Sequence, residues 1–181
     1  MSNPEYSYRF ATSLDIDVIM KGLLEILFLE ENKTSFFSEE KKQEQYNLIC
    51  NAIDKKTIIV SEYNANNKNN TNNTNNTNNA NNKNEVIGFI WFNITNKCFY
   101  GLDYGNLENQ YMFISYIWVI ETFRNKGIAM QLYDKVINYA KENYTNIKKI
   151  WIDIYMSNEK SIHFHNKLGF KQQITLYSKD I

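Results

Sequence analysis

The sequence predicts an α/β or α+β domain in which helices cover both faces of a central mixed sheet. Short segments rich in β-branched and aromatic residues alternate along the chain with longer segments whose apolar residues recur every three or four positions. The chain has 181 residues, which is about the size of one domain. We therefore expect residues 1–181 to form a single domain.

The first half of the chain contains two predicted strands and two predicted helices. Tyr6 to Ala11 alternates enough to form a strand, and Thr12 to Asp15 has the Ser/Thr-x-x-acid pattern that starts a helix. Ser38 and the two glutamates after it open a second helix that runs to about Ile53, and Thr57 to Val60 forms a short strand. The apolar face expected of the first helix consists of Leu14, Ile16, Ile19, Leu23, Leu24, Ile26 and Leu27.

Residues 64–84 form a tract of Asn, Thr and Lys with almost nothing to bury, so we expect the tract to be disordered. The strand predicted over Val86 to Phe92 follows at once, which places the tract between two strands. Because the free energy of loop closure grows only logarithmically with length, a long insertion at a hairpin tip costs little. We interpret the tract as a tolerated insertion; an interaction segment is the alternative.

The second half of the chain again contains two predicted strands and two predicted helices. A strongly apolar strand, Tyr111 to Ile120, precedes a helix over Gly127 to Asn143. Ile150 to Met156 is a further predicted strand, and Asn158 to Leu168 is a short amphipathic helix. Gly169 follows that helix directly and can take the left-handed conformation that ends it.

Charge and cysteine content limit the classes of partner. Twenty basic and twenty acidic residues cancel, so no overall positive field attracts nucleic acid or an anionic membrane. No apolar run approaches the roughly 18 residues of a membrane span, and the N-terminus lacks the pattern of a secretory signal. Two cysteines without ligand spacing indicate a reducing compartment and no metal. The sequence favours the cytoplasm and leaves the nucleus open.

The segment from Ile120 to Ala129 joins the apolar strand to the following helix and is the first candidate site. A glycine and an alanine near a helix start let the backbone approach a ligand, while unpaired N–H groups and the helix dipole attract an anion. Arg124 and Lys126 add positive charge. The pattern predicts a cradle for phosphate or pyrophosphate, and a basic turn that only caps the helix is the alternative.

Two blocks of the sequence resemble the GNAT acyltransferase family. Val119 followed by the segment from Phe123 to Ala129 is similar to the family's acetyl-CoA signature, Arg/Gln-x-x-Gly-x-Gly/Ala. The segment from Asn158 to Phe170 is similar to Asn-x-x-Ala/Ser followed by Phe-Tyr-x-x-Leu-Gly-Phe. This second block resembles the ribosomal-protein alanine and N-terminal acetyltransferases, with His165 in place of the usual tyrosine. The resemblance implies a splayed mixed sheet that holds acetyl-CoA in its opening.

The resemblance also implies which residues bind the cosubstrate. Backbone groups of Ile117, Trp118 and Val119 would pair with the pantetheine arm. Asn158 would lie beside the pantetheine or the thioester. Ser161, in the same block, would also bind the cosubstrate. The residues that would hold the pyrophosphate are Arg124, Asn125, Lys126, Gly127, Ile128 and Ala129.

Two residues are candidates for proton transfer. By resemblance, His165 would protonate the CoA thiolate; the alternative is a half-buried histidine that fills the space of the family's tyrosine. Because an imidazolium is a stronger acid than a phenol, His165 as the acid would shift activity toward lower pH. Asp153 matches the position of a glutamate proposed as general base in the ribosomal-protein alanine acetyltransferases and would act through a water. The alternative is an aspartate on a half-exposed strand face.

The expected function is direct transfer of acetyl from acetyl-CoA to a primary amine of a protein, a peptide or a small molecule. A lysine-type amine costs about 4 kcal/mol to deprotonate near neutral pH and an α-amine under about 1 kcal/mol, so an α-amine is the easier substrate. Acidic residues that flank the acceptor side in the family would suit a polyamine instead, and simple solvation of these charges is the alternative; the residues are Glu30, Glu31, Asp103 and Glu108.

A non-catalytic CoA-binding or interaction protein of the same fold is the alternative function. Ser115 and Tyr116 stand where other members of the family keep a glutamate, so that carboxylate is absent. Only residues 171–181 follow Phe170, where the family usually has two strands. Either the sheet has an open edge at this end of the chain, which would favour a homodimer, or the final strand is missing.

Overall fold

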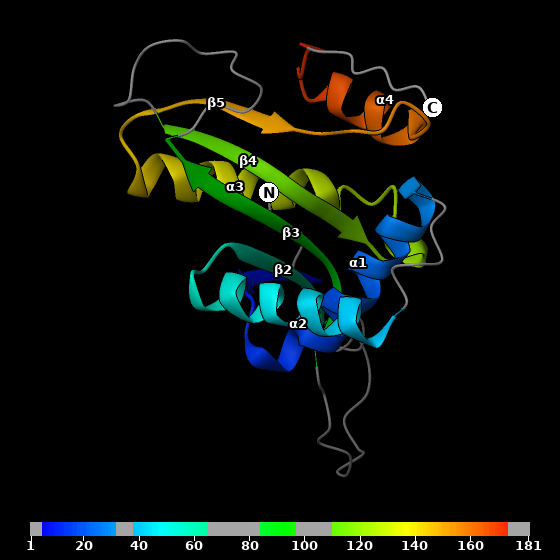
Figure 1. Cartoon of the computed structure of the whole chain (residues 1–181). Coiled ribbons are helices and arrows are strands. Elements are labelled where there is room, and N and C mark those ends of the chain that lie inside the picture. Colours follow the sequence, from blue (N-terminus) through cyan, green and yellow to red (C-terminus); the bar gives the residue numbers. More distant parts are fainter. Residues whose placement is uncertain (1–4, 32–37, 65–83, 97–109, 174–181) are drawn as a thin grey trace, which may run out of the picture.

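The computed structural model describes residues 5–31, 38–64, 84–96 and 110–173 (Figure 1). Helices are labelled α, and short 3-10 helices are labelled η. In chain order the elements are β1 (Tyr6–Phe10), η1 (Ser13–Asp15), α1 (Ile16–Glu31), α2 (Glu39–Asp54), β2 (Ile58–Tyr63), β3 (Glu85–Thr95), β4 (Gln110–Val119), η5 (Glu121–Phe123), α3 (Ile128–Asn143), β5 (Ile147–Ile152) and α4 (Glu159–Lys167).

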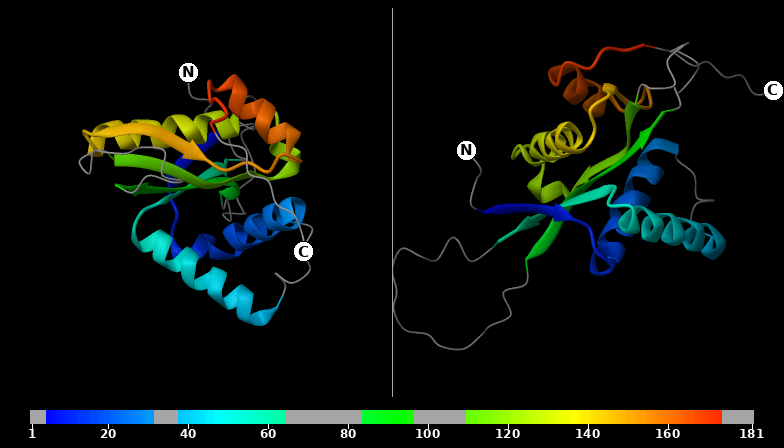
Figure 2. Two further views of the ribbon diagram at one scale, coloured as in Figure 1. Left: turned by 45° about the horizontal axis from the view of Figure 1, so that its top comes forward. Right: turned by 90° about the vertical axis from the view of Figure 1, so that its left-hand side faces the viewer.

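The strands form one mixed sheet in the order β1-β2-β3-β4-β5. Neighbouring strands from β1 to β4 are antiparallel, whereas β4 and β5 are parallel. Helices α1 and α2 cover one face of the sheet, and α3 covers the other with α4 beside it (Figure 2). The predicted fold class, a mixed sheet with helices on both faces, is confirmed.

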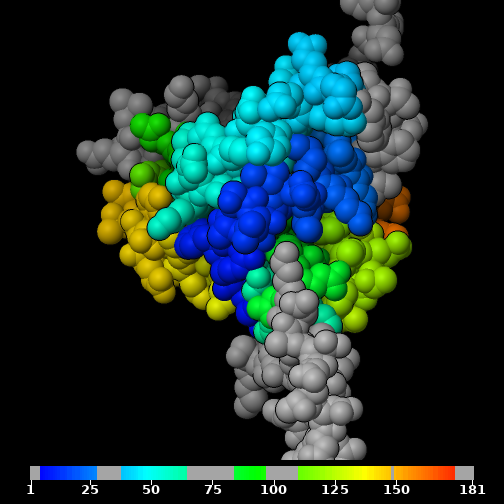
Figure 3. Space-filling model, turned by 90° about the horizontal axis from the view of Figure 1, so that it is seen from below, coloured from blue at the N-terminus to red at the C-terminus, as the bar shows by residue number. Residues whose placement is uncertain are grey.

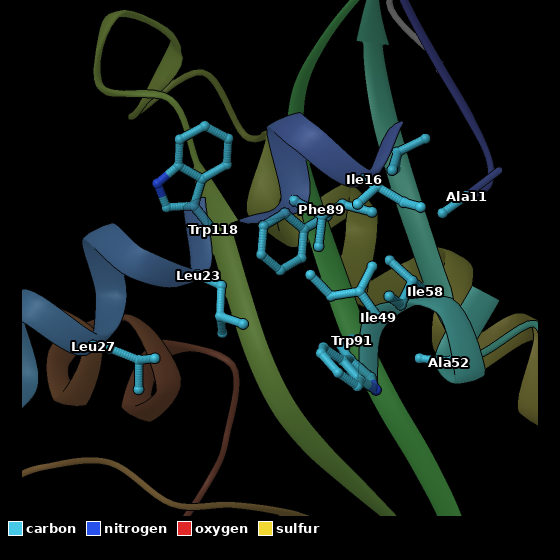
Figure 4. Close-up of a cluster of buried hydrophobic side chains, with 12 residues drawn as sticks. Ala11, Ile16, Leu23, Leu27, Ile49, Ala52, Ile58, Phe89, Trp91 and Trp118 are labelled. Carbon is cyan, nitrogen blue, oxygen red and sulfur yellow. The ribbon is translucent and has the colours of Figure 1, made fainter. Parts of the chain in front are cut away.

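Apolar side chains fill the space on both faces of the sheet. Ile19 and Leu23 of α1 are fully buried against one face, in the cluster that Figure 4 shows. Leu132 and Val136 of α3 are fully buried against the other face. Full burial of a side chain of this size contributes about 1.5–3 kcal/mol, so both helices are held firmly against the sheet. Strand β4, which carries the candidate site, lies between them.

The start of α1 follows the predicted box. Asp15 accepts a hydrogen bond from the Thr12 backbone N–H at 2.7 Å, and Arg9 donates two further bonds to the same carboxylate at 2.7 and 2.9 Å. Burial alone would raise the pKa of Asp15, but the bonds from Arg9 and Thr12 lower it. The prediction that Leu14 belongs to the apolar face is wrong, because Asp15 takes the inward position of η1 and Leu14 is 84% exposed.

The connection between β2 and β3 agrees with a hairpin that carries an insertion. These strands are antiparallel, and Tyr63 lies opposite Glu85. Residues 64–84 therefore join neighbouring strand ends, as predicted. The predicted disorder of this tract falls on residues 65–83, which lie outside the described part of the chain.

Strand β5 begins and ends earlier than the sequence pattern indicates. The sequence predicts a strand from Ile150 to Met156, but pairing with β4 begins at Ile147 and ends at Ile152. The pattern of apolar residues missed Ile147 because two lysines separate it from Ile150. Among the described residues β5 forms one edge of the sheet, and the homodimer inferred from an open edge stays a prediction.

Candidate functional site

The candidate site lies where β4 and β5 separate. The two strands pair in parallel only as far as Ile114 of β4 and Ile152 of β5. From there β4 continues to Val119 beside β3, while β5 turns away toward α4 (Figure 1). The sheet is therefore splayed at the C-terminal ends of two parallel strands.

A β-bulge lies at the point of separation. Trp91 of β3 pairs with Tyr116, and the next residue, Phe92, pairs with Ile114. Ser115 is therefore the extra residue on β4. A bulge bends its strand and shifts the alternation of side chains by one residue, so it helps to direct β4 away from β5.

The backbone of β4 beyond the bulge presents polar groups to the opening. The Ile120 N–H donates to the Ile87 carbonyl of β3 at 2.9 Å. Because successive residues of a strand direct their N–H and C=O groups to opposite sides, those of Ile117 and Val119 point away from β3. The Val119 carbonyl accepts a hydrogen bond from Arg124 Nε at 2.8 Å, which agrees with this direction.

The turn after β4 leads directly into the N-terminus of α3. Asn125 and Gly127 both have a positive φ, 63° and 79°. Gly127 is the residue that precedes α3, and no described side chain caps this helix or places an acid in its first turn. Helices α2 and α4, by contrast, each have both a side-chain cap and an acidic first turn. The N–H groups at Ile128 and Ala129 thus begin a helix whose positive end attracts an anion.

The two basic side chains of the turn lie in different places. Arg124 pairs with Glu25 of α1, with Nη2 2.6 Å from Oε1. Lys126 is exposed, and its Nζ lies 4.6 Å from the ring centroid of Phe123. Arg124 is therefore held by α1, whereas Lys126 stays beside the turn. The pairing with Glu25 was not predicted, because no sequence pattern relates residues so far apart.

The polar residues of the second block hold the first turn of α4. The Asn158 side-chain oxygen accepts a hydrogen bond from the Ser161 N–H at 3.1 Å, which caps the helix. At the other end, Gly169 has φ 87°, the left-handed conformation that the sequence predicts for it. Both ends of α4 are thus set by local sequence, and the helix follows directly after the opening between the strands.

His165 is buried between α3 and α4. It is only 1% exposed, which is deeper than the half-buried position that the packing alternative expects. Its Nδ1 lies 2.7 Å from the Ser161 carbonyl oxygen and its Nε2 lies 2.7 Å from the Tyr133 hydroxyl. Because a carbonyl only accepts, Nδ1 is assigned the proton, and the Tyr133 hydroxyl then donates to Nε2. The aromatic rings of Phe164 and Phe170 enclose the imidazole, with centroids 5.0 and 5.4 Å away.

This environment favours the neutral imidazole. Burial lowers the pKa of His165, and the hydrogen bond to the Ser161 carbonyl opposes that effect only in part. Tyr133, the partner, is also buried, and burial raises the pKa of its hydroxyl. No sequence motif marks Tyr133 as part of the site; the available signal is its place next to Leu132 on the inner side of the predicted helix.

Asp153 lies at the vertex of the opening. It is exposed and is the first residue after the last pair between β4 and β5, as Ser115 is on the other strand. The prediction that Asp153 lies within the strand is wrong by one residue, because pairing ends at Ile152. The two proton-transfer candidates thus occupy different environments, His165 buried among aromatic rings and Asp153 exposed at the fork.

Other predicted features are only partly described. Asp103 and Glu108 lie outside the described residues, and Glu30 and Glu31 form the end of α1. Across residues 5–31, 38–64, 84–96 and 110–173, no three His, Cys, Asp or Glu side chains are grouped so that they could hold a metal ion. In the same part of the chain, no helix combines the length and apolar character needed to cross a membrane.

Comparison with known proteins agrees with this geometry. Residues 28–170 match the model of the acetyltransferase (GNAT) family. An uncharacterized N-acetyltransferase of Methanocaldococcus jannaschii is 35% identical over 57 residues, which are 32% of this chain and 24% of that protein. The match thus spans about a quarter of the length of that curated relative.

Solved structures share the fold along almost the whole chain. A Bacillus halodurans protein, determined as a tetramutant, has a TM-score of 0.70 at 15% identity and covers 97% of this chain and 99% of its own. The aminoglycoside N-acetyltransferase AAC(6')-Iy in complex with CoA has a TM-score of 0.62 at 14% identity and covers 97% and 95%. At such identities the likeness concerns the fold.

Proposed function

Because the chain belongs to the acetyltransferase (GNAT) family, we propose that it transfers the acetyl group of acetyl-CoA directly to a primary amine. The acceptor is an amine of a protein or peptide, or a small amine. Among these, the lower deprotonation cost favours an α-amine over a lysine side chain. The solved complex of AAC(6')-Iy with a bisubstrate analogue joins CoA to an acetylated neamine, which supports a CoA cosubstrate and an amine acceptor for this fold.

The backbone conformation of the turn between β4 and α3 is the main support for this proposal. Its two left-handed residues, Asn125 and Gly127, lie directly before α3, and the first turn of the helix contains no acid. A pyrophosphate would accept hydrogen bonds from the first N–H groups of the helix, including those of Ile128 and Ala129. Lys126 would add positive charge beside it.

The edge of β4 supports the rest of the cosubstrate. The backbone groups of Ile117 and Val119 point into the opening, where an amide-containing pantetheine arm would extend the sheet by strand-like pairing. The same N–H groups would polarise the thioester carbonyl and stabilise the negative charge that develops on its oxygen. The side chain of Trp118, which lies between Ile117 and Val119 in the sequence, faces α1. Asn158 and Ser161 would contact the arm from the start of α4.

Proton transfer is proposed to use Asp153 rather than His165. Asp153 is exposed at the fork, where an incoming ammonium and a bridging water can reach its carboxylate. His165 has both ring nitrogens engaged by Ser161 and Tyr133, so it lacks a group to offer the departing thiolate. The geometry therefore supports the alternative that His165 packs α4 against α3.

A non-catalytic CoA-binding protein is the second candidate function. The engaged ring of His165 and the serine at the position of the family's glutamate both favour it. In this case the turn and the β4 edge would bind CoA as proposed, while no amine would be acetylated.

The deciding experiment measures thiol release from acetyl-CoA by the full chain, together with CoA affinity by calorimetry. The acceptor panel contains N-terminal peptides, lysine peptides, polyamines and aminoglycosides. Release with one acceptor class supports the transferase and identifies its acceptor. Micromolar CoA affinity without release from any acceptor favours the binding protein, and no affinity for CoA contradicts both.

Asp153→Asn tests the proposed base with the acceptor that the panel identifies. We expect kcat to fall about tenfold or more, because general-base catalysis by a side chain contributes about 100-fold or more. CoA affinity should stay at the wild-type value, since the side chain lies at the fork and not at the turn. Wild-type kcat in this variant would exclude Asp153 as the base.

A further inference from the structure

Strand β4 and helix α1 approach each other closely at Trp118. A side chain at Gly22 would place its Cβ 2.6 Å from the Trp118 ring and 2.8 Å from Phe89, so this position of α1 has no room for one. Figure 4 shows Trp118 beside Phe89, and their ring centroids are 5.9 Å apart. The indole therefore fixes the distance between α1 and the C-terminal half of β4.

Glu25 lies almost one turn further along α1 and binds two residues of the candidate site. One carboxylate oxygen accepts from Trp118 Nε1 at 2.9 Å, and the other accepts from Arg124 Nη2 at 2.6 Å. Trp118 is only 4% exposed, so its N–H needs a protein acceptor. In Figure 3 the yellow-green residues lie beside the blue residues of α1.

Arg124 continues the network into the opening. While Nη2 binds Glu25, Nε donates to the Val119 carbonyl at 2.8 Å. The guanidinium thus joins α1 to the end of β4 from within the turn that leads to α3. Both side chains of the ion pair are partly exposed, 41% for Arg124 and 36% for Glu25. An ion pair with this exposure contributes little to stability, so its geometric effect is the more informative one.

We propose that Glu25 is a positioning residue for acetyl-CoA and that Arg124 acts through Glu25 and Val119 rather than by contact with the pyrophosphate. Glu25 holds the guanidinium against the Val119 carbonyl, and this contact keeps the turn in the shape that presents the N-terminus of α3. Trp118, held by the same carboxylate, keeps α1 against β4. The inference rests on the proposed acetyl-CoA site and assigns to Arg124 a different role from the one the sequence motif implies.

A double-mutant cycle in CoA affinity tests the inference. Calorimetry on the full chain compares wild type, Glu25→Ala, Arg124→Ala and the double variant, with free CoA as the probe. We expect each single variant to bind CoA about five- to tenfold more weakly and the double variant to bind no more weakly than either, because both substitutions break one unit. With the acceptor identified by the panel, KM for acetyl-CoA should rise while kcat stays within about twofold.

Two further variants separate positioning from loss of folding. Glu25→Gln keeps the size of the side chain and one acceptor oxygen. We therefore expect its affinity for CoA to lie between those of the wild type and Glu25→Ala. Glu44→Ala removes a similarly exposed ion pair of α2, with Lys41 at 2.9 Å, and should bind CoA as the wild type does. Melting temperatures of all variants show whether the protein is folded at the temperature of the titration.

Three results would overturn the inference while leaving the proposed function intact. Wild-type affinity in Glu25→Ala would remove the positioning role. A loss in Arg124→Ala alone would indicate direct contact with the pyrophosphate, and losses that multiply in the double variant would make the two residues independent. Absence of CoA binding by the wild type would instead contradict the proposed function itself.

Discussion

At the scale of the residue, His165 shows how a position that looks catalytic can have a structural environment. Burial lowers the pKa of its imidazole below the ordinary value of 6.5, which favours the neutral ring. The unfolded chain therefore takes up a proton near pH 6.5, while the folded chain resists protonation until lower pH. The stability associated with the neutral ring is present above about pH 6.5 and is lost as the pH falls toward the lowered pKa.

His165→Tyr tests this environment. We expect the melting temperature of the wild type to fall more than that of the variant between pH 7.5 and pH 5, because the variant has no imidazole to protonate. The pH profile of kcat should keep its shape if His165 only packs. A profile that moves to higher pH in the variant would instead make His165 the acid and contradict the packing role.

The second histidine is a matched control. His163 lies two residues earlier on the same helix and is exposed, so His163→Gln should melt with the pH dependence of the wild type. The chain contains two histidines in all, so the two variants together test every imidazole in the protein. A similar change in both variants would show that the effect belongs to α4 as a whole and not to the buried ring.

At the scale of the element, the N-terminus of α3 depends on a glycine whose conformation matters more than its size. Gly127 has φ 79°, and an added Cβ would meet only the end of the Gln131 side chain, 3.9 Å away. Gly169 at the end of α4 has φ 87° and nothing within 4 Å. The two positions therefore have the same backbone requirement, but only Gly127 lies at the proposed pyrophosphate cradle.

Gly127→Ala and Gly169→Ala form a matched pair for the cradle. Each should lower the free energy of unfolding by about 1–2 kcal/mol, because an L-residue is strained in the left-handed region. Only Gly127→Ala should also weaken CoA binding, by about five- to tenfold, since the strain shifts the turn that presents the helix. Equal CoA affinities for the two variants, measured by calorimetry, would contradict the cradle.

At the scale of the whole molecule, the insertion between β2 and β3 is expected to be separable from the rest of the fold. Tyr63 and Glu85 face each other across the hairpin, so removal of residues 65–83 would leave a loop of two residues, Asn64 and Asn84. Such a loop matches the two-residue hairpin turns that suit antiparallel strands, particularly when glycine is second.

Deletion of residues 65–83 combined with Asn84→Gly tests the insertion. We expect the melting temperature to stay within about 5 °C of the wild type or to rise, because the shorter loop loses less entropy on folding. CoA affinity should not change. A second variant replaces residues 65–83 with glycine and serine at the same length. It separates the effect of the tract's composition from the effect of its length. A clear fall in melting temperature or affinity would show that the tract contributes to the fold or the site.

Local sequence was sufficient for much of the fold. Apolar residues that recur every three or four positions located the helices, and short segments rich in β-branched and aromatic residues located the strands. Thr12, Gly127 and Gly169 correctly marked where helices begin and end. Helix boundaries follow from capping chemistry that involves residues three or four positions apart. The errors lie where tertiary contacts decide. Leu14 is exposed, and the ends of β5 depend on pairing with β4. Strands β2 and β3 run past the predicted ends, Val60 and Phe92, to Tyr63 and Thr95 because they pair with neighbouring strands.

The sequence by itself located the turn that is proposed to bind an anion, the two family blocks and the identities of the two proton-transfer candidates, because each is a pattern of neighbouring residues. Only the tertiary structure decided what these residues contact. Glu25 reaches Trp118 across 93 positions and Arg124 across 99, and Tyr133 meets His165 across 32. Such pairs arise because α1 and α4 pack against other elements of the fold, and no local pattern encodes which side chains then meet.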